Sequence, residues 1–490
     1  MNDNHQFSSL IYEYFLLRIQ FGYYSYGDTL PTIDTLCREF SVGAQTVKAA
    51  LRRLRTEGYI SMYSGQTTRI LFRQTEKERL YFVRSFYSHR REDFFDLYEA
   101  GEFIFIPLHM ECLRNMNDAD LAYLTCLSER AQPDDLFRFY SYTLQKLNNS
   151  LALNLFWETS MFHGFPFART STWPLPYDAG LVQNRMQSLI AQVRRYDRDA
   201  VHNMLLDYQR RDIARLKEHM ASGSAPASKE DRTPFVWRIY RDRPQLCYSL
   251  AIRILHDIYM GEYSSHNYLP SYEKISKKYG ISISTVRRTI TLLNQAGAAH
   301  SVNGVGTRIY TMGEQCNKPD LNSPAVRQNL ALFIQAFELI VYSCEGIMLD
   351  LLNHVSRQRL NAFIDQLAGN RQNGQCERTV WHILIFIAEN HPLNGIREIY
   401  SKIYGLFLWG YPLRASLEEH WKLYQARADM TFTEMMIQHL KNNDYKQCSR
   451  TFHELTVQQF DTAINYLSRQ GISPEELRLS PSIRMLSTEI

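Results

Sequence analysis

Apolar residues recur at helical spacing near the start of the chain, and two shorter helical segments follow. Phe7–Phe21 carries an apolar residue at every third or fourth position and ends at a glycine, which predicts a helix. Thr32 can cap a second helix that runs to about Glu39, and a third helix is predicted over Ala44–Glu57. Two short β runs then flank a polar tip at Gly65. This order predicts a helix-turn-helix followed by a β wing.

The same series of residues returns later in the chain. Leu30-Pro31-Thr32 recurs as Leu269-Pro270-Ser271, an offset of 239 residues (269 − 30). Without a gap, this offset aligns further turn and core residues, among them Gly22 with Gly261, Thr46-Val47 with Thr285-Val286, Gly58 with Gly297, Gly65 with Gly304, and Thr68-Arg69-Ile70 with Thr307-Arg308-Ile309. Such an ordered series points to duplication. The second copy is predicted to form helices over Gln245–Met260, Ser271–Tyr279 and Ser284–Ala296, and a hairpin around Asn303–Gly306.

The third helix of each copy has an apolar face and an opposite face that is basic and carries hydroxyl or amide groups. A helix of this kind fits the major groove, where Arg and Lys read guanine edges and Gln reads adenine. Glycine beside Thr-Arg at each wing tip suits phosphate or minor-groove contact. The predicted DNA-contacting residues are Gln45, Thr46, Lys48, Arg52, Gly65, Thr68, Arg69, Ser284, Thr285, Arg287, Arg288, Gly304, Thr307 and Arg308.

The overall charge excludes a polycationic nucleic-acid binder, so a DNA-binding surface must be local. The 490 residues include 55 basic and 51 acidic side chains, a formal net charge of +4. Residues 1–74 hold 8 basic and 6 acidic residues (+2), and residues 241–312 hold 9 and 4 (+5). Both repeated modules are therefore basic.

The cysteines and the N-terminus indicate a cytoplasmic protein. The 8 cysteines lie far apart without a Cys-x-x-Cys pair, so neither a zinc site nor a disulfide framework is expected. The N-terminal residues lack the pattern of a signal peptide. The most apolar long window, Leu330–Leu352, is interrupted by Gln335, Glu338, Glu345 and Asp350, and it predicts a buried helix. We therefore expect no membrane association.

The repeated motifs also carry a resemblance. The first copy reads GYYSYGDTLPT, TVKAALRRLRTEGYI and GQTTRI, and the second reads GEYSSHNYLPS, TVRRTITLLNQAGAA and GVGTRI. In order and spacing these resemble the winged helix-turn-helix domain of the GntR family of bacterial transcriptional regulators. The resemblance covers about 130 of the 490 residues and implies a sequence-specific transcriptional regulator that binds double-stranded DNA.

Two positions depart from the family pattern. The family often carries Arg shortly after Leu-Pro-Ser, where this chain has Asp34 and Glu273. It often carries another Arg before the recognition helix, where this chain has Ala44 and Ile283. The operator sequences of relatives therefore do not carry over.

The longer regions after the two modules are rich in Leu, Phe, Tyr, Arg and Gln and are predicted to be helical. Arg378–Ile403 resembles a segment of the all-helical, FCD-like effector domain of the family, and Leu136–Glu158 resembles it more distantly. The resemblance implies control by a small-molecule effector. The expected fold is mainly α, divided into winged helix 1 (1–74), helical domain 1 (75–220), a linker (221–240), winged helix 2 (241–313) and helical domain 2 (314–490). Within the linker, the small and polar residues 221–230 are expected to be flexible.

Many helical effector domains of the family hold a metal through one Asp and three His. His382 stands at the first His place, but Tyr140 stands there in the other half, and Leu136 and Arg378 replace the Asp. We therefore expect no metal and no cofactor. The aromatic candidates for lining an effector pocket are Phe162–Phe167, Trp157, Trp173, Trp381 and Trp409.

Two other functions remain open from the sequence. Some GntR relatives fuse one winged helix to an aminotransferase-like enzyme that binds pyridoxal phosphate. The low glycine content (22 residues) and the second winged helix argue against this alternative. A protein-interaction scaffold is the other, and the basic helix faces argue against it. With two modules in one chain, the protein is expected to act as a monomeric pseudo-dimer or as a homodimer.

Overall fold

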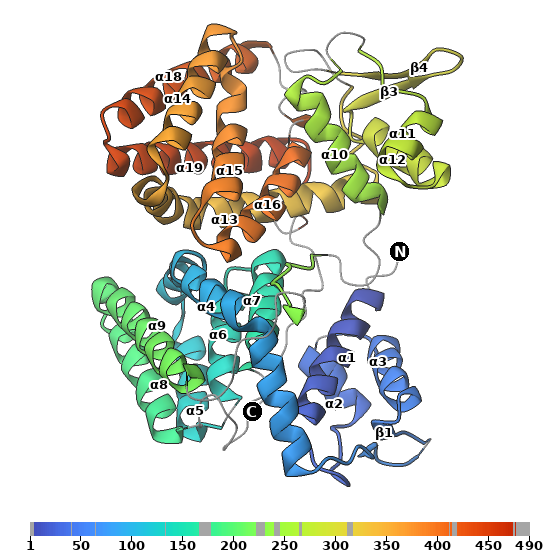
Figure 1. Ribbon diagram of the computed structural model, residues 1–490, viewed down its shortest axis with the longest axis vertical. Coiled ribbons are helices and arrows are strands. Elements are labelled where there is room, and N and C mark those ends of the chain that lie inside the picture. Colours follow the sequence, from blue (N-terminus) through green and yellow to red (C-terminus); the bar gives the residue numbers. More distant parts are fainter. Residues whose placement is uncertain are drawn as a thin grey trace. The chain divides into compact units, whose positions relative to one another are not determined.

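The computed structural model describes residues 4–476 apart from several short stretches. The residues outside the description are 1–3, 41, 64, 133, 166–177, 222–230, 240–245, 264–266, 311–316, 411, 414–418, 474–475 and 477–490. The chain divides into two compact units, the first mainly residues 1–242 and the second mainly residues 243–392 and 396–479. Each unit contains a winged-helix module followed by a helical domain (Figure 1).

Winged helix 1 consists of three helices and a two-stranded wing. The helices are α1 (Asn4–Gln20), α2 (Ile33–Phe40) and α3 (Ala44–Thr56). In the wing, β1 (Ile60–Ser61) pairs antiparallel with β2 (Arg69–Ile70). The core joins all of these elements through side chains that are at most 1% exposed: Ile11, Phe15, Leu36, Leu51, Ile60 and Ile70.

Winged helix 2 repeats this architecture. Its elements are α10 (Leu246–Met260), α11 (Tyr272–Tyr279), α12 (Ile283–Gln295), β3 (Ala299–Val302) and β4 (Gly306–Ile309). The bounds of α11 and α12 are those of α2 and α3 plus 239 residues (33 + 239 = 272, 56 + 239 = 295). The wing keeps its register, because Ala299 pairs with Ile309 as Ile60 pairs with Ile70. The predicted duplication is confirmed.

Helical domain 1 contains six described helices. They are α4 (Glu76–Arg114), α5 (Asp118–Arg130), α6 (Asp135–Gln145), α7 (Ser150–His163), α8 (Ala179–Arg194) and α9 (Arg198–Ala221). Thr75 and Glu78 form a capping box at the start of α4, which fixes where the long helix begins after the wing. Asn117 and Asp120 cap α5 in the same way.

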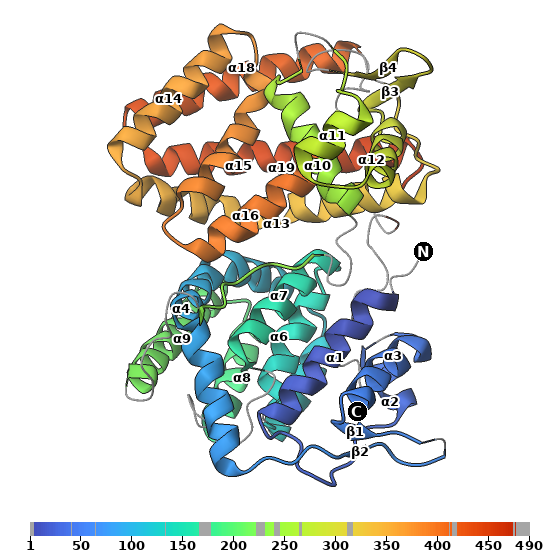
Figure 2. The same ribbon diagram turned by 45° about the vertical axis from the view of Figure 1, so that its right-hand side comes forward.

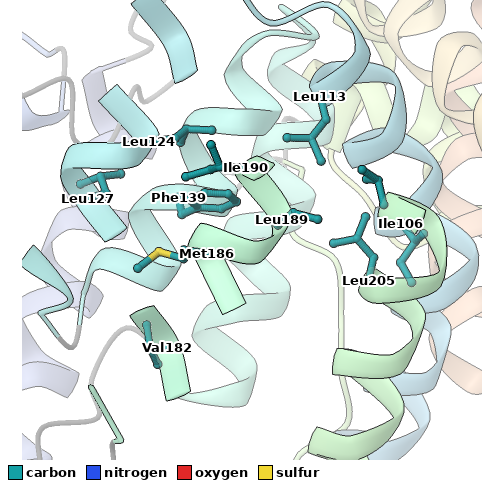
Figure 3. Packing of buried hydrophobic residues seen from close by; sticks show 11 residues of the cluster. Ile106, Leu113, Leu124, Leu127, Phe139, Val182, Met186, Leu189, Ile190 and Leu205 are labelled. Atoms are coloured by element: carbon teal, nitrogen blue, oxygen red, sulfur yellow. The ribbon is translucent and has the colours of Figure 1, made fainter. Parts of the chain in front are cut away.

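The core of helical domain 1 is aliphatic. Leu124 and Leu127 of α5 face Met186 and Ile190 of α8 across Phe139 of α6 (Figure 3). Residues of α4 and α9 close the same cluster. Each fully buried side chain of this size contributes about 1.5–3 kcal/mol, so this cluster holds five of the six helices together.

Helical domain 2 has the same order of helices. They are α13 (Pro324–His354), α14 (Arg357–Gln372), α15 (Thr379–Asn390), α16 (Asn394–Phe407), α18 (Glu419–Lys441) and α19 (Tyr445–Arg469), with 3₁₀ turns η3 (Cys376–Arg378) and η4 (Leu408–Gly410). The helix α13 packs on α19 and α14 on α18, as α4 packs on α9 and α5 on α8. The predicted mainly α fold is confirmed.

The helix α13 is the one described helix that is long and apolar enough to cross a membrane, by length and composition alone. Of its most apolar window, 67% is buried inside the unit. Its buried side chains include Phe337, Ile340 and Met348, and it packs along α19. This is how a core helix behaves, in agreement with the interpretation of the 330–352 window.

Part of the predicted linker is packed. We call residues 231–239 the strap. It crosses α4, where the backbone N–H of Phe235 donates to Asp93 (3.0 Å), and α7, where the indole N–H of Trp237 donates to Asn154 (2.8 Å). Phe235 and Trp237 are only 7% and 1% exposed. The strap therefore belongs to the first unit, although it was expected to be part of the linker over 221–240. Residues 222–230, the part of the expected flexible stretch that precedes the strap, lie outside the described residues.

Candidate nucleic-acid interface and ligand cavity

The exposed face of α3 is set by how the helix is anchored. The hydroxyl of Thr32 accepts from the backbone N–H of Thr35 (3.1 Å) and starts α2, which packs on α3. Val47, Leu51 and Leu54 of α3 are fully buried, with 0% exposure. The opposite face of α3 reaches solvent with Gln45 exposed, Arg52 exposed and Lys48 half-buried.

The exposed face of α12 is more basic. Ser282 caps the helix by accepting from the N–H of Thr285 (3.2 Å), and Val286, Ile290 and Leu293 are buried. Ser284, Arg287 and Arg288 are exposed. Neither α3 nor α12 has an acidic residue in its first turn, so the positive end of each helix dipole is not neutralised.

Both wings turn on glycines in the left-handed region. Gly65 has φ of 75° and Gly304 has φ of 76°, a conformation that other residues rarely adopt. Arg69 and Arg308 are exposed beside these tips. The guanidinium of Arg69 donates to the carbonyl of Gly27 (3.2 Å), which holds this side chain against the turn before α2.

Two predicted contact residues lie elsewhere. The side chains of Thr46 and Thr307 are 1% and 5% exposed, so they belong to the core side of their elements, in contrast to the prediction. Thr46 is buried because it lies one helical turn before the buried Ala50, at the edge of the inner face of α3. Thr307 is buried because alternate residues of β4 face inward, and its hydroxyl lies 3.2 Å from that of Ser301 across the wing. Thr68 and Thr285 are half-buried.

The sequence-based list also omitted two lysines. Lys274 and Lys277 are exposed on α11, the first helix of the helix-turn-helix, which crosses the DNA backbone in this motif. The run KISKK was the available signal. Glu273 on the same helix is close enough to Arg287 for their charges to interact. Hydrogen bonds from its own backbone amide and from Ser271, together with Arg287, lower the pKa of Glu273.

Winged helix 1 is joined to helical domain 1 by a buried ion pair. The guanidinium of Arg18 on α1 lies 2.8 Å from the carboxylate of Asp134, just before α6, and the two side chains are 6% and 12% exposed. Tyr14 and Tyr23 stack on this guanidinium at 4.2 and 4.0 Å. An unpaired charge here would cost several kcal/mol, so this contact specifies how the two domains meet.

Aromatic rings continue this junction toward the interior of the helical domain. Tyr14 of α1 meets Trp157 of α7 edge to face at 5.9 Å, and Trp157 meets Phe137 of α6 at 4.7 Å. Figure 2 shows α1 lying between α3 on one side and α6 and α7 on the other. Winged helix 1 therefore contacts Asp134 at the start of α6 and Trp157 of α7, and both of these helices contribute to the wall of the cavity described next.

A cavity of about 320 Å³ lies inside helical domain 1. Its walls come from α4, α6, α7, α8 and α9. The aromatic residues of the wall are Tyr98, Phe105, Phe137, Tyr140, Phe156, Phe165 and Tyr208. Of the aromatic candidates from the sequence, Phe165 lines this cavity. Trp157 contacts the lining residue Phe137 edge to face, and Trp173 lies outside the described residues. A second hollow of about 430 Å³ is bounded by charged residues at or next to helix ends, among them Arg114, Asp118, Asp197 and Arg198.

Helical domain 2 has less room in its interior. The corresponding cavity is about 90 Å³ and is lined by Phe333, Phe337 and Trp381 among others. His382 of α15 is buried outside the lining of this cavity, and its Nδ1 lies 2.9 Å from the amide nitrogen of Asn370. Across the described residues, no group of three or more His, Cys, Asp or Glu side chains is arranged to hold a metal ion.

Comparisons with known proteins agree with the two modules. The family described as "Bacterial regulatory proteins, gntR family" matches residues 8–70 and 249–309. No curated protein matches the chain.

Solved structures with similarity include three bacterial proteins. "Streptococcus agalactiae GntR" is 17% identical, with 42% of this chain and 99% of that chain covered and a TM-score of 0.22. "E. coli McbR/YncC" is 15% identical, with 44% and 99% covered and a TM-score of 0.24. A Listeria monocytogenes structure, titled "Lar controls the expression of the Listeria monocytogenes agr system and mediates virulence", is 12% identical, with 45% and 97% covered and a TM-score of 0.22. The family assignment rests on the two matched sequence segments.

Proposed function

We propose that this chain, which carries two domains of the gntR family in tandem, is a sequence-specific DNA-binding transcriptional regulator. The observation that carries the proposal is the pair of matched winged helices, each with a basic third helix whose outer face is open to solvent. Each helix would enter a major groove, with its wing against the neighbouring backbone or minor groove. The exposed lysines of α11 would add phosphate contacts.

We further propose that a small molecule bound in a helical domain controls DNA binding. The support comes from the first unit, where α6 and α7 both line the cavity and contact winged helix 1. A ligand that displaces Phe137 would act on Trp157 and through it on Tyr14 of α1. A ligand controls the protein only as far as it binds two arrangements of this junction with different affinity.

The enzyme alternative has less support. A pyridoxal-phosphate enzyme of the aminotransferase type needs a large α/β domain. In the described part of the chain, the strands form two two-stranded sheets, one in each winged helix. The remaining described elements are the helices of the two winged-helix modules and of the two helical domains.

Selection from a random double-stranded DNA library tests the proposed function. The full-length protein is incubated with the library, and bound fragments are sequenced over successive rounds. We expect enrichment of one motif, with an affinity that falls steeply between about 50 and 200 mM salt. A library that stays random after selection would instead favour the scaffold alternative.

A further inference from the structure

The described wall of the cavity in helical domain 1 is rich in aromatic side chains, and its charged side chains balance one another. Phe137 and Phe156 stack with an interplanar angle of 12°, and Phe165 stacks on His163 at 5.1 Å. Its volume of about 320 Å³ lies at the lower end of the roughly 300–1,000 Å³ typical of small-molecule sites. A compact molecule with a few rings would fill it.

The buried cation in the wall already has its counter-ion. Both terminal nitrogens of Arg185 on α8 donate to the two carboxylate oxygens of Asp212 on α9, each at 2.7 Å. The hydroxyl of Tyr98 also lies 3.5 Å from this carboxylate. A bidentate pair of this kind leaves little uncompensated charge for a ligand carboxylate to meet.

The two imidazoles of the wall are neutral. Burial lowers the pKa of His109 to about 3 and that of His163 to about 4, so neither is protonated near pH 7. The Nε2 atom of His163 lies 3.1 Å from the carbonyl of Phe94. The Nδ1 atom of His109 is buried and has no hydrogen-bond partner among the described residues. Two polar atoms of the described wall are therefore unsatisfied: Nδ1 of His109, which is uncharged, and Nε of Arg185, whose positive charge is compensated by Asp212.

The remaining charged residues of the wall are balanced. Asp178 is exposed and Arg215 is half-buried, one negative and one positive. With Arg185 and Asp212, the described part of the wall has two cations and two anions, so the formal charge of these residues is zero. A ligand with a net charge in the interior would lose its hydration without gaining a counter-ion, which is strongly unfavourable.

We propose that this cavity binds an uncharged aromatic molecule that carries a hydrogen-bonding group. The inference rests on the proposed effector control and names the chemical class of the effector. The rings of the ligand pack against Phe105, Phe137 and Phe156, and its polar group lies on the side of His109. An organic acid is the class that the wall disfavours.

Two fluorescent probes with the same ring system test this class. N-phenyl-1-naphthylamine is uncharged, and 1-anilinonaphthalene-8-sulfonate adds a sulfonate to the same rings. With the full-length protein, we expect saturable binding of the uncharged probe at one site per chain. Its dissociation constant should be at least about tenfold lower than that of the sulfonate, which corresponds to about 1.4 kcal/mol. Equal or tighter binding of the sulfonate would overturn the inference.

A substitution that fills the cavity locates the site. A Cβ at Gly101 on α4 would sit 3.5 Å from Phe105 and from Gln209, ordinary contact distances, so Gly101→Leu can fold with its side chain in the cavity. The matched control is Gly369→Leu on α14, where a Cβ meets nothing within 4 Å. We expect Gly101→Leu to abolish binding of the uncharged probe and the control to retain it.

A second variant and a second readout keep the test decisive. Phe165→Ala removes a ring at a site that is 38% exposed, so the fold should tolerate it, and probe affinity should fall several-fold. Unchanged probe binding in both Gly101→Leu and Phe165→Ala would show that the probe binds elsewhere and refute the inference. DNA binding is measured in parallel. A protein that selects DNA but fails the probe test loses the ligand class and keeps the proposed function.

Discussion

The two winged helices have nearly the same backbone but opposite charges at one pair of positions. Arg18 of the first corresponds to Asp257 of the second (18 + 239 = 257), and Glu39 corresponds to Lys278 (39 + 239 = 278). In winged helix 1, Arg18 reaches outside the module to Asp134 of the helical domain. In winged helix 2, Asp257 pairs with Lys278 inside the module at 3.0 Å.

The surroundings of these charges differ accordingly. Burial raises the pKa of Glu39, against the opposing charges of Arg138 and Arg18. Burial alone would lower the pKa of Lys278, but its hydrogen bonds to Asp257 and Tyr279 raise it. Winged helix 2 meets its own helical domain through other groups, such as Tyr259 against Trp381 at 5.0 Å and Ser323 on Gln295 at 3.2 Å.

The duplicated modules have kept the same winged-helix fold, but the contacts between each winged helix and its own helical domain have changed. The unit with the buried interdomain ion pair is also the unit with the larger cavity, about 320 against 90 Å³. We infer that ligand control acts mainly on winged helix 1, and that winged helix 2 supplies DNA affinity.

The largest expected effect comes from disabling either reading helix. Lys48→Glu with Arg52→Glu, or Arg287→Glu with Arg288→Glu, should weaken binding to the selected DNA by about 10²–10⁴-fold. The reason is that binding by the second module of one chain is intramolecular. Fluorescence anisotropy on a defined duplex gives the affinities. The control is Lys446→Glu with Arg450→Glu on α19, outside the modules, where both side chains are exposed. It has the same charge change as both variants and the same spacing as Lys48 and Arg52, and it should have little effect on DNA affinity.

The same DNA decides whether one chain replaces a dimer. The two reading faces differ, so we expect a site with two unlike halves, occupied by one chain in native mass spectrometry. Two chains on the minimal site would end the pseudo-dimer proposal. So would full affinity after winged helix 2 is disabled.

The next largest effect should come from the junction of winged helix 1. Arg18→Ala removes a cation that is only 6% exposed and leaves Asp134 without its counter-ion, with a hydrogen bond from Tyr23, and we expect a loss of about 3–5 kcal/mol in the free energy of unfolding. Lys278→Ala should cost less, because Lys278 is 48% exposed and because Asp257 keeps hydrogen bonds from the hydroxyls of Tyr263 and Tyr279. Urea unfolding, with hydrogen exchange of α1 and α10 peptides, measures both. Equal losses in the two variants would contradict the contrast between the junctions.

Acid should destabilise both units, a property in which they are alike. Burial lowers the pKa of His109 and His391 to about 3 and that of His163 and His382 to about 4. Because the unfolded pKa is near 6.5, the unfolded state binds more protons below that pH, and stability falls as the pH drops from 6.5 toward 4. Each group should contribute about 2 kcal/mol of this loss at pH 5.

Denaturation curves at pH 7 and pH 5 check this prediction. His109→Phe should reduce the acid sensitivity of the first unit and leave that of the second unchanged, as followed by hydrogen exchange. If the variant is as sensitive to acid as the parent protein, the assignment of a neutral buried imidazole is wrong.

The smallest expected effect is on the salt dependence of DNA binding, and it distinguishes the exposed face of α3 from that of α12. Arg287→Ala with Arg288→Ala should reduce the slope of log affinity against log salt by about one unit for each lost phosphate contact, and Lys48→Ala with Arg52→Ala should reduce it less. The reason is that Lys48 is half-buried whereas both arginines are exposed. Salt titrations of both variants decide this. Arg53→Ala is the control, because Arg53 stacks on Tyr12 at 3.7 Å.

The winged helices were predictable because short motifs determine them. Thr32, Ser271 and Ser282 cap helices, glycines make the turns, and the spacing of Val47, Leu51 and Leu54 determines the inner face of α3. The repeat then aligned the second copy. Thr46 was misplaced because a residue at the edge of the buried face cannot be assigned from spacing alone.

The junction and the cavity were not predictable. Arg18 and Asp134 are 116 residues apart (134 − 18), and no local pattern indicates that they meet. Aromatic residues that fill a core and those that line a cavity have the same periodicity, so Phe137 and Phe452 are indistinguishable in the sequence. The strap was assigned to the linker that begins with the small and polar residues 221–230, although Phe235 and Trp237 are buried.

The strap also limits how far apart winged helix 1 and winged helix 2 of one chain can bind on DNA. It ends at Ile239, and α10 begins at Leu246. Seven residue steps span at most about 25 Å of contour length. The 20 residues expected as a linker would have allowed nearly three times that reach. Trp237 and Arg238 are anchored on the first unit, Arg238 by ion pairs with Glu13 and Glu158. If both modules of one chain bind DNA as proposed, this short connection limits the spacing between the half-sites of an operator. Insertion of a few base pairs between the half-sites should then prevent one chain from binding both.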